Sequence, residues 1–541
     1  MRKSILKGIS LALASLLVCV GLVSCKPETS EEPKSTIYDE SYTNIIDDHY
    51  RNYYEIFVYS YFDTNNDGIG DINGVTQKLD YIKEMGFNGI WLMPVHEGTS
   101  YHKYDVEDYY SIDKDFGTIE DFENLLKEAH ARGINVIMDL VVNHTSSNHS
   151  WFKEATAYIK QNGASGGKYG DFYNFTTKKQ EKYDPVSGTN YYYEARFWGG
   201  MPDLNLDSQN VRDEIKNIVK FWLDKGVDGF RLDAVTSYYT GNVPKNVAFI
   251  KWLNETVKEI KSAAYIVGEA WEGTHGQVRE YYDSGADSFF AFPLATATGG
   301  IANVLKDIYP NNGKKYGELL LDLQSIYDTG ILAPFLGNHD TARPASFLGQ
   351  SQTDKIKMAG GLLQMMNGSS FVYYGEEIGM LSKDSGSSDP RKRIAMLWED
   401  KSVYTGMCYK PPENITVTKD SYYYPSVAAQ LEDPNSILSY YKHANLLRNQ
   451  NPEIARGVVE VIQGEHSPYC CVIKKTYNGD SIYLVINLDR EYEQTVSLNL
   501  SGVTLDVGLV GVLCANADTA IEYNVADNSV YLPSYSIAIF R

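Results

Sequence analysis

Three acidic residues, each at the end of a short apolar run, are the side chains best placed to do chemistry: Asp233, Glu269 and Asp340. Short apolar runs that end in charged residues are typical of buried parallel strands with polar groups at their carboxyl ends. In a (β/α)8 barrel those ends form one rim, so we expect the three carboxyl groups to converge on one pocket. Carboxyl groups around a pocket, with Arg231 and histidines beside them, suit cleavage of a glycosidic bond.

The elements that would position these acids alternate between strand and helix from about Tyr53 onward. Regular alternation of this kind predicts a parallel sheet with covering helices. The first predicted elements are a strand at Tyr54–Ser60, a helix at Val75–Met85, a strand at Asn88–Met93, a helix at Ile119–Arg132 and a strand at Ile134–Val142.

The alternation is interrupted once. Residues 144–205 are crowded with Gly, Asn, Tyr and Trp, and so long an irregular stretch fits a compact unit only as an inserted subdomain. The sequence therefore predicts an α/β fold, a (β/α)8 TIM barrel of residues 46–143 and 206–452 with an inserted domain B at 144–205, after strand 3.

The C-terminal part, residues 453–541, has a different texture. Six short β-type runs separated by turn residues lie between Val458 and Phe540, which predicts a small antiparallel β-sandwich. The cysteines outside the N-terminal segment have no metal-ligand spacing and form no disulfide framework, and the sequence assigns no bridge among them. They are Cys408, Cys470, Cys471 and Cys514.

Seven motifs in order carry a resemblance to a known family. From about Tyr53 to its C-terminus, the chain resembles the α-amylase family of glycoside hydrolases (family 13), and the segment at 201–205 is similar to that of the subfamily intermediate between oligo-1,6-glucosidases and neopullulanases. The motifs are Asp139-Leu-Val-Val-Asn143-His144, Met201-Pro-Asp-Leu-Asn205, Gly229-Phe-Arg231-Leu-Asp233, Gly268-Glu269, Gly337-Asn338-His339-Asp340, Tyr373-Tyr-Gly-Glu-Glu-Ile-Gly379 and Arg393-Ile-Ala-Met-Leu-Trp398.

The resemblance implies a role for each acid: Asp233 as nucleophile, Glu269 as acid/base and Asp340 as the carboxylate that stabilises the transition state. The chemistry agrees, because a retaining mechanism needs one ionised carboxylate and one protonated carboxyl, about 5–5.5 Å apart. Arg231, two residues before Asp233 on the same strand face, should keep Asp233 ionised. Crowded negative charge should raise the pKa of Glu269 and keep it protonated near neutral pH.

Four residues are expected to bind substrate. By resemblance, His144 and His339 bond hydroxyls of the sugar at the cleavage point, and Tyr104 stacks under that sugar; Arg231 completes the set. Two positions depart from the family pattern. Lys103 replaces the usual Gly before the tyrosine, and Thr236-Ser237 replaces a common Lys-His pair, which leaves the affinity for the leaving-group side open.

An acidic loop is the clearest candidate for a metal site. It places oxygen-bearing residues at alternating positions around Gly68, which allows a tight turn, and this suits a structural Ca²⁺ ion. It is not a true EF-hand, because position twelve is Gly74 where a bidentate Glu is required. A similar loop binds calcium in the resembling subfamily, and in many family members the equivalent of Asn143 binds calcium too. The candidate ligands are Asp63, Asn65, Asp67, Ile69 and Asp71.

The N-terminus is predicted to be a lipoprotein signal peptide, residues 1–25. Basic residues precede an apolar run, Ile9 to Val23, that is too short and wrongly flanked for a spanning helix. Leu22-Val-Ser-Cys25 resembles a bacterial lipobox that is lipidated at Cys25; the alternative is an ordinary signal peptide. Residues 26–45 suit a flexible tether. We therefore expect a body that is lipid-anchored to a bacterial membrane, at the cell surface or elsewhere outside the cytoplasm.

The composition limits the partners. A net charge of −21 argues against nucleic acid and anionic membrane surfaces, so membrane contact is expected through the N-terminal lipid alone. A hydrophobic content of 43% allows a large core, and we expect a monomer. The 43 tyrosines are explained mostly by ordinary packing, although a sugar-binding cleft needs several exposed rings.

The leading hypothesis is retaining endo-hydrolysis of α-1,4-glucosidic bonds in starch and maltooligosaccharides. Ala234 supports it, because family members with a small residue after the nucleophile cleave α-1,4 bonds, whereas α-1,6-specific relatives tend to carry Val. The alternatives within the family are an oligosaccharide-specific α-glucosidase, a neopullulanase-like enzyme and a transglycosylating enzyme. A barrel that only binds glucan is a hypothesis from another class; loss of a carboxylate would mark it, and all three are present.

Overall fold

The computed structural model describes residues 48–541 apart from 307–310, 383–388, 400–405, 416, 418–421, 500–501, 504, 506–507 and 517–518. The predicted signal peptide, Cys25 and the tether lie outside the described residues. Within the part of the chain that is described, no helix has the length and apolar character needed to cross a membrane.

The centre of the fold is an eight-stranded parallel barrel whose strands follow one another in chain order. Each strand pairs in parallel with the next, and a parallel bridge between Phe335 and Phe371 joins the seventh strand's extension to the eighth. The predicted TIM barrel is confirmed. Its strands are β1 (Asn52–Ile56), β2 (Gly89–Leu92), β5 (Asn135–Leu140), β9 (Gly229–Leu232), β10 (Tyr265–Gly268), β11 (Ser288–Phe290), β12 (Ile331–Ala333) and β13 (Ser370–Tyr373).

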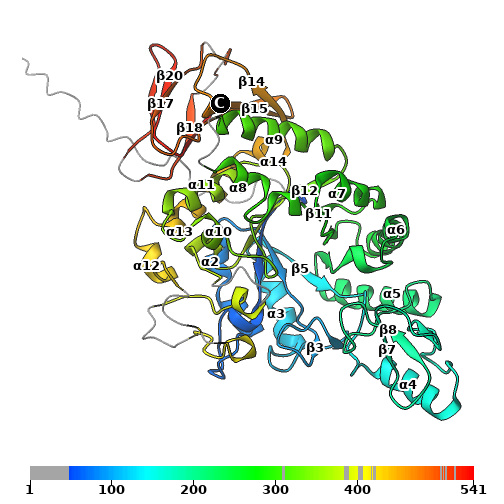
Figure 1. Ribbon diagram of the computed structural model, residues 1–541. Helices are drawn as coiled ribbons and strands as arrows, with labels where there is room; N and C mark the ends of the chain where they lie inside the picture. The colour runs from blue at the N-terminus through cyan, green and yellow to red at the C-terminus, as the bar shows by residue number, and fades with distance from the viewer. Residues whose placement is uncertain are drawn as a thin grey trace, which may run out of the picture. The chain divides into compact units, whose positions relative to one another are not determined.

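Helices lie outside these strands, as Figure 1 shows for α5, α6 and α7. Local signals fix their ends: Thr118 and Asp121 form a capping box at the start of α3, and Gly226 ends α5 with a φ of 110°. The helices are α1 (Ile72–Gln77), α2 (Leu79–Glu84), α3 (Ile119–His130), α5 (Gln209–Lys225), α6 (Val243–Ile260), α7 (His275–Tyr281), α8 (Gly300–Val304), α9 (Asn312–Ile326), α10 (Pro344–Leu348), α11 (Thr353–Gln364), α12 (Val427–Leu431), α13 (Ile437–Gln450) and α14 (Pro452–Arg456).

Two predicted elements differ from the structure. The strand expected at Tyr54–Ser60 ends at Ile56, because its neighbours β2 and β13 end at the same level, and Val58–Ser60 is a 3-10 turn. The single helix expected at Val75–Met85 is two helices, α1 and α2, that meet at Lys78. The Lys78 ammonium lies about 4 Å from the rings of Phe62 and Trp398, which fixes this break against the neighbouring loop.

Two excursions leave the carboxyl ends of early strands. A hairpin of β3 (Glu97–Gly98) and β4 (Val106–Asp108) follows β2. Between β5 and β9 the chain forms α4 (Ser150–Asn162) and a small antiparallel sheet of β6 (Phe175–Thr176), β7 (Tyr183–Pro185) and β8 (Tyr192–Glu194). This insertion after the third strand is as predicted, and it returns to the barrel where the Leu204 N–H donates to the Asn143 carbonyl at 2.9 Å.

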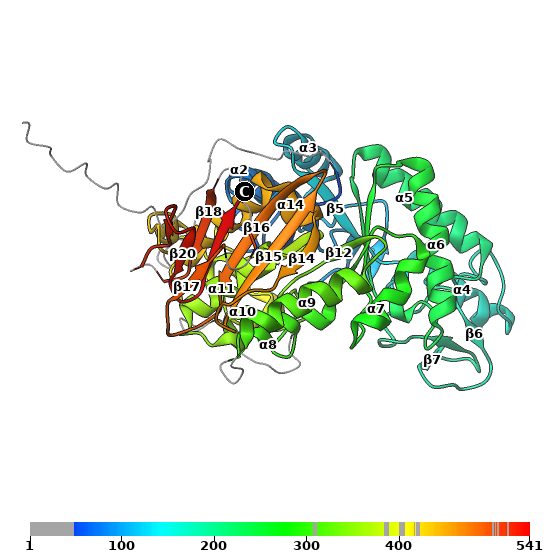
Figure 2. The ribbon, with the colours of Figure 1, turned by 90° about the horizontal axis from the view of Figure 1, so that it is seen from above.

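The C-terminal strands form the predicted sandwich. A five-stranded sheet (β14-β15-β16-β21-β18) and a three-stranded sheet (β17-β20-β19) share one apolar core, and Figure 2 shows α9 running alongside the larger sheet. The four described cysteines are free thiols. The strands are β14 (Val458–Ile462), β15 (Cys470–Tyr477), β16 (Asp480–Asn487), β17 (Gln494–Ser497), β18 (Leu509–Cys514), β19 (Glu522–Asn524), β20 (Ser529–Leu532) and β21 (Ser536–Phe540).

The barrel interior is a packed core. Tyr53 stacks on Phe371 with ring centroids 4.7 Å apart and on Tyr265 at 5.2 Å, and Trp91 packs above them. The site therefore rests on rigid aromatic layers.

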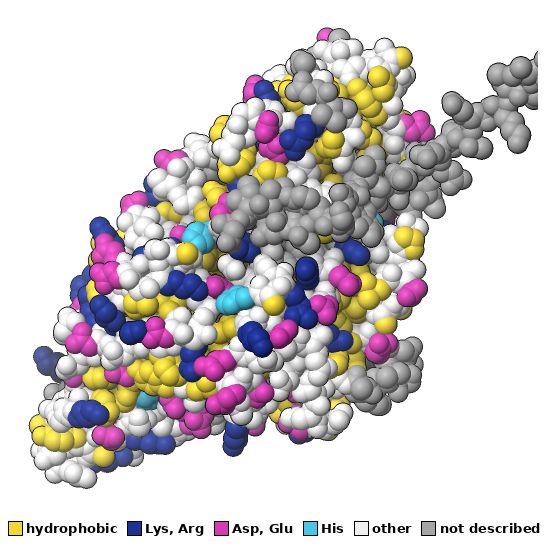
Figure 3. Space-filling view, turned by 180° about the vertical axis from the view of Figure 1, so that it is seen from behind, with side chains coloured by type: hydrophobic (Ala, Val, Ile, Leu, Met, Phe, Trp, Pro, Cys, Tyr) yellow, Lys and Arg dark blue, Asp and Glu magenta, His cyan; other side chains and the backbone are white. Residues whose placement is uncertain are grey.

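On the face drawn in Figure 3, acidic and basic side chains are intermingled and no sign of charge dominates.

Candidate active site

The three predicted acids lie at the carboxyl ends of barrel strands. Asp233 and Glu269 directly follow β9 and β10 and are 7% and 6% exposed, and Asp340 lies beyond β12 in a more open position. In a TIM barrel this end carries the catalytic groups, whereas the opposite end serves stability.

One buried guanidinium gathers the carboxyl groups. Arg231 Nη1 lies 2.6 Å from Asp233 Oδ1 and 2.6 Å from Asp139 Oδ1, and its Nη2 lies 2.9 Å from Glu269 Oε1. Arg231 is 1% exposed; burial opposes its charge, but the three surrounding carboxyl groups raise its pKa. Asp233 and Glu269 are thus held on two nitrogens of one planar group.

Glu269 has the electrostatics of a proton donor. Its Oε2 accepts the Ala234 N–H at 2.8 Å; this bond and the Arg231 pair both favour the ionised form. Burial, followed by the charges of Asp233 and Asp340, outweighs them and raises the pKa of Glu269 to about 8. The carboxyl group is therefore protonated at neutral pH.

Asp340 is the opposite case. Burial would raise its pKa, but His339 and then Arg393 lower the pKa of this carboxyl well below its usual range. His339 Nε2 lies 2.9 Å from Asp340 Oδ2, and Arg393 Nη2 lies 2.6 Å from Oδ1. His339 is itself cationic, since Asp340 and Glu55 overcome burial and raise its pKa to about 9.

Tyr104 and the two histidines complete the group. The Tyr104 hydroxyl lies 2.8 Å from His339 Nε2 and donates to Asp139 Oδ2 at 3.2 Å, while its ring lies nearly parallel to the His339 ring, 20° apart. His144 is buried, and burial lowers its pKa, so its neutral ring donates to the Tyr104 carbonyl at 3.2 Å. The structure thus brings the predicted catalytic and substrate-binding residues into one connected network.

Two residues of this network were not assigned a role from the sequence. Glu55 lies in β1 and accepts from His339 Nδ1 at 2.5 Å, and Arg393 holds Asp340. The sequence signal that could have identified Glu55 is its position as an acidic residue inside an apolar strand. Arg393 stands in one of the seven motifs, but its pairing with Asp340 depends on how loops beyond the strands fold.

Aromatic rings flank the carboxyl cluster. Phe197, 48% exposed, packs edge-to-face on His144 with centroids 5.2 Å apart, and Trp271, 52% exposed, stacks on Phe292 at 4.6 Å. Tyr238 follows the Thr236-Ser237 departure, and its buried hydroxyl has no hydrogen-bond partner among the described residues. Phe197 and Trp271 supply exposed stacking faces of the kind that a sugar-binding cleft requires.

The acidic loop at 63–71 folds around its own carboxylates. Asp63 accepts the N–H groups of Asn66 and Gly68 at 2.7 Å, and Asp71 accepts that of Thr64 at 2.8 Å. Among the described residues no Lys, Arg or His pairs with Asp63, Asp67 or Asp71, and no cluster of three or more His, Cys, Asp and Glu is close enough to hold a metal ion. The oxygen donors suit Ca²⁺ in kind, but Asn65 and backbone carbonyls would have to complete the shell.

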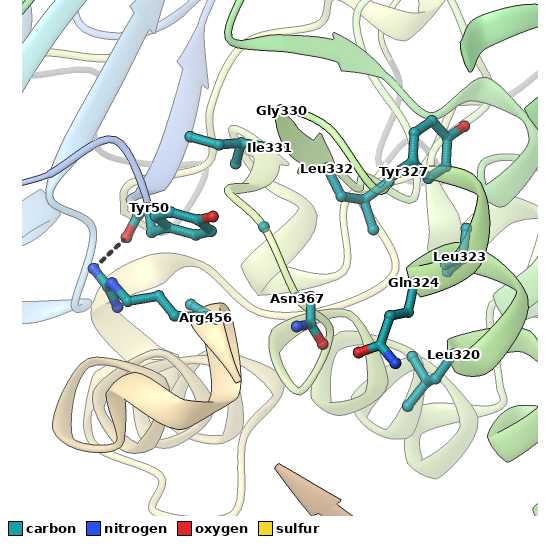
Figure 4. A pocket seen from close by; sticks show the side chains of 12 residues that line it. Tyr50, Leu320, Leu323, Gln324, Tyr327, Gly330, Ile331, Leu332, Asn367 and Arg456 are labelled. Atoms are coloured by element: carbon teal, nitrogen blue, oxygen red, sulfur yellow. Dashed lines mark hydrogen bonds between the residues drawn. The ribbon is translucent and has the colours of Figure 1, made fainter. Parts of the chain in front are cut away.

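A separate cavity of about 110 Å³ lies at the amino ends of the strands, between the start of β12, α9 and α14 (Figure 4). Two of its polar side chains already have hydrogen-bond partners within the protein. Gln324 exchanges two hydrogen bonds with Val459, and Asn367 bonds to Gly457 and Lys475. Its lining carries no carboxyl group, and we assign it no part in the chemistry.

A barrel with three carboxyl groups around one guanidinium at its carboxyl end has the groups expected of a glycoside hydrolase, and comparisons with known proteins identify a family of these enzymes. A family model described as the α-amylase catalytic domain matches residues 55–457. Alpha-amylase 3 of Dictyoglomus thermophilum is 38% identical, covering 83% of this chain and 86% of that protein. An oligo-1,6-glucosidase of Heyndrickxia coagulans is 32% identical, covering 82% and 92%.

A solved structure points the same way. The solved structure of Eubacterium rectale Amy13B superposes on this structure with a TM-score of 0.85. The two sequences are 41% identical, and the match covers 92% of this chain and 96% of the Amy13B chain. The chain therefore belongs to the α-amylase family, family 13 of the glycoside hydrolases.

Proposed function

We propose that this enzyme cleaves α-1,4-glucosidic bonds within starch and maltooligosaccharides, with retention of configuration. The observation that carries the proposal is the single Arg231 guanidinium bonded to both Asp233 and Glu269. This contact holds the two carboxyl groups side by side, and burial with the charges of Asp233 and Asp340 raises the pKa of Glu269 to about 8, which suits the proton donor that a double displacement requires.

In the proposed mechanism the Asp233 carboxylate attacks the anomeric carbon while the bond to the leaving sugar breaks. Glu269 gives its proton to the leaving oxygen. A glycosyl ester of Asp233 forms, and Glu269, now ionised, takes a proton from water, whose oxygen attacks the anomeric carbon and releases Asp233. Asp340, ionised beside His339 and Arg393, stabilises positive charge at the sugar ring in both transition states.

The substrate-binding residues follow from the same geometry. Tyr104 presents a ring whose hydroxyl is fixed by His339 and Asp139, so its face is set for stacking under the sugar at the cleavage point. By resemblance to the family, the rings of His144 and His339 would contact that sugar's hydroxyls. Phe197 and Trp271 would stack on neighbouring sugars, since both rings are about half exposed.

The product profile tests the proposal. The purified enzyme is given soluble starch, pullulan and isomaltose in separate reactions. An endo-acting α-1,4 hydrolase makes iodine staining of starch fall rapidly and releases mixed maltooligosaccharides in the α configuration. No products from any substrate would contradict the proposal and favour a barrel that only binds glucan.

An oligosaccharide-specific enzyme is the second candidate. Its support is that relatives at similar identity are named oligo-1,6-glucosidase and trehalose synthase/amylase. Water and sugar acceptors attack the same covalent intermediate, so neopullulanase-like and transglycosylating activities use the same residues. Glucose release from short oligomers, or cleavage of isomaltose or pullulan, would establish this branch.

A structural calcium ion at the loop 63–71 is part of the proposal. The ligands would be Asp63, Asn65, Asp67, Asp71 and the backbone of Ile69, and the ion would supply the positive charge that this loop lacks among its described neighbours. Its role would be to stabilise the loop after β1, with no part in the reaction steps.

Location at a bacterial membrane through lipidated Cys25 is the remaining proposal, with a monomeric body on a tether. A labelled fatty acid fed to producing cells should be incorporated into the wild-type protein and not into a Cys25→Ser variant. Equal labelling, or none in either, would contradict the anchor.

A further inference from the structure

Lys103 adopts a backbone conformation that lysine rarely takes. Its φ is +61°, in the left-handed region where a Cβ atom crowds the following carbonyl and where glycine is usual. The residue is 4% exposed. A buried lysine in a strained conformation persists only when its surroundings hold it there.

The Lys103 ammonium is tied to the chain that follows β2. Its Nζ lies 2.8 Å from Asp113 Oδ2 and donates to the Gly98 carbonyl at 2.9 Å. Asp113 is equally buried; its carboxylate accepts the Gly98 N–H at 3.1 Å, and its own N–H donates to the Val95 carbonyl at 2.8 Å. The pair therefore joins the tip of the β3-β4 hairpin to its base at the end of β2.

The next residue, Tyr104, reaches into the carboxyl cluster. Its hydroxyl lies 2.8 Å from His339 Nε2 and donates to Asp139 Oδ2 at 3.2 Å, and its carbonyl accepts from His144 Nε2 at 3.2 Å. The backbone conformation of Lys103 determines the position of Tyr104. A shift at Lys103 would therefore move the hydroxyl and the carbonyl of Tyr104 together.

We propose that Lys103 is a positioning residue for catalysis: its buried ion pair with Asp113 holds Tyr104 in register with His339 and Asp139. A glycine would adopt the same φ without strain, but it would leave the hairpin tip without this anchor. The inference rests on the proposed function, since it concerns how the same site is held. Lys103 itself touches none of the three catalytic carboxyl groups.

The test replaces the pair as a unit. In K103M/D113N both charges are removed together, so that no buried charge is left alone. We expect kcat/KM on maltotetraose to fall about 100-fold, as follows from a displacement of about 1 Å in a catalytic site, with circular dichroism unchanged. K103G/D113N, which relieves the left-handed strain and so folds more readily, should show the same loss. Wild-type kcat/KM in a folded variant of either kind would overturn the inference.

A matched control separates positioning from general stability. Lys258 and Asp287 form another ion pair, at 2.8 Å, near the amino ends of the strands. K258M/D287N should lower the melting temperature and leave kcat/KM within about twofold, because that end of a barrel serves stability. An equal loss of kcat/KM in this control would show that any lost ion pair has the effect, and would overturn the role of Lys103.

A double-mutant cycle with Y104A then locates the effect. If the pair acts by placing the Tyr104 side chain, K103M/D113N should change kcat/KM by less than about threefold in the Y104A background. The full 100-fold loss in that background would overturn the inference. If the wild-type enzyme hydrolysed no α-1,4 bonds at all, the proposed function would be wrong instead. That result would be known before any variant is made.

Discussion

Buried carboxyl groups have different ion-pair partners at the two ends of the barrel. At the carboxyl end Asp139, Asp233 and Glu269 share Arg231, so buried carboxyl groups outnumber the cations that face them. At the amino end each carboxylate has partners of its own. Asp228 pairs with His130 at 2.7 Å and with Lys261 at 2.9 Å.

The amino-end carboxylates also have backbone donors. Asp228 also accepts the Val136 N–H, and Asp287 accepts the Ile266 N–H, both at 2.8 Å. Burial would raise the pKa of Asp228, yet its bonds to His130 and Lys261 lower it, whereas burial and like charges raise the pKa of Glu269 to about 8. Cations and hydrogen bonds of its own keep Asp228 ionised, whereas burial and neighbouring carboxylates outweigh the shared Arg231 at Glu269 and favour its protonated form.

The strongest test of this contrast is the same substitution at both ends. Asp233→Asn removes the proposed nucleophile and should lower kcat on starch by about 10⁴-fold or more, while folding and maltooligosaccharide binding persist. Asp228→Asn is the matched control and should leave kcat within about twofold. Retained hydrolysis in the Asp233 variant would remove the nucleophile assignment.

The second test uses the raised pKa of Glu269. The proposed acid must carry a proton, so kcat/KM should fall as the pH rises through about 8. Glu269→Gln should lower kcat on starch by about 10²–10⁴-fold. A maltoside with a 2,4-dinitrophenolate leaving group needs no proton, so the variant should form its glycosyl ester at nearly the wild-type rate. An equal loss on both substrates would contradict the role as acid.

Most of the barrel could be predicted because its signals are local. Apolar runs, glycine stops and helix caps mark β2, β5, α3 and the strand ends that carry Asp233 and Glu269. Short strands such as β11, β19 and β20 were not predicted, since three or four residues are too few to display a period. The break at Lys78 lies where its ammonium packs on the rings of Phe62 and Trp398, and Trp398 is distant along the chain.

The site was predictable to the extent that it lies on strand ends. Asp233, Glu269 and Arg231 follow from strand position and alternation. Glu55 and Arg393 do not, because their partners His339 and Asp340 are brought to them only by barrel closure and by loops of no regular structure. The anchor of Lys103 is likewise a tertiary contact, although its departure from the family glycine marked the position.

The third test asks what the amino end contributes. Asp228→Asn should lower the free energy of unfolding by about 1–3 kcal/mol at pH 7, through weakened charge-assisted bonds. Because the pKa of Asp228 is lowered on folding, this contribution is fully present above the unfolded pKa of about 3.9 and is lost as the pH falls through the folded pKa. Urea unfolding at pH 7 and pH 3 measures it. Asp224→Asn, on the exposed face of α5, is the control, and a difference that grows in acid would contradict the pairing.

The last and smallest expected effect concerns the loop 63–71, whose carboxylates differ from those at both ends of the barrel. Here Asp63, Asp67 and Asp71 have backbone donors but no ion pair among the described residues, so a bound cation would supply the missing charge. Chelation should lower the melting temperature by about 1–2 °C, equivalent to about 1–2 kcal/mol in a chain of this size. Asp67→Asn keeps the oxygen that accepts the Ile69 N–H and should abolish the difference between calcium and chelator. Since the loop contributes no group to the carboxyl cluster, kcat below the melting temperature should stay within about twofold. A melting temperature indifferent to chelation, in wild type and variant alike, would show that this loop is held by its own backbone bonds.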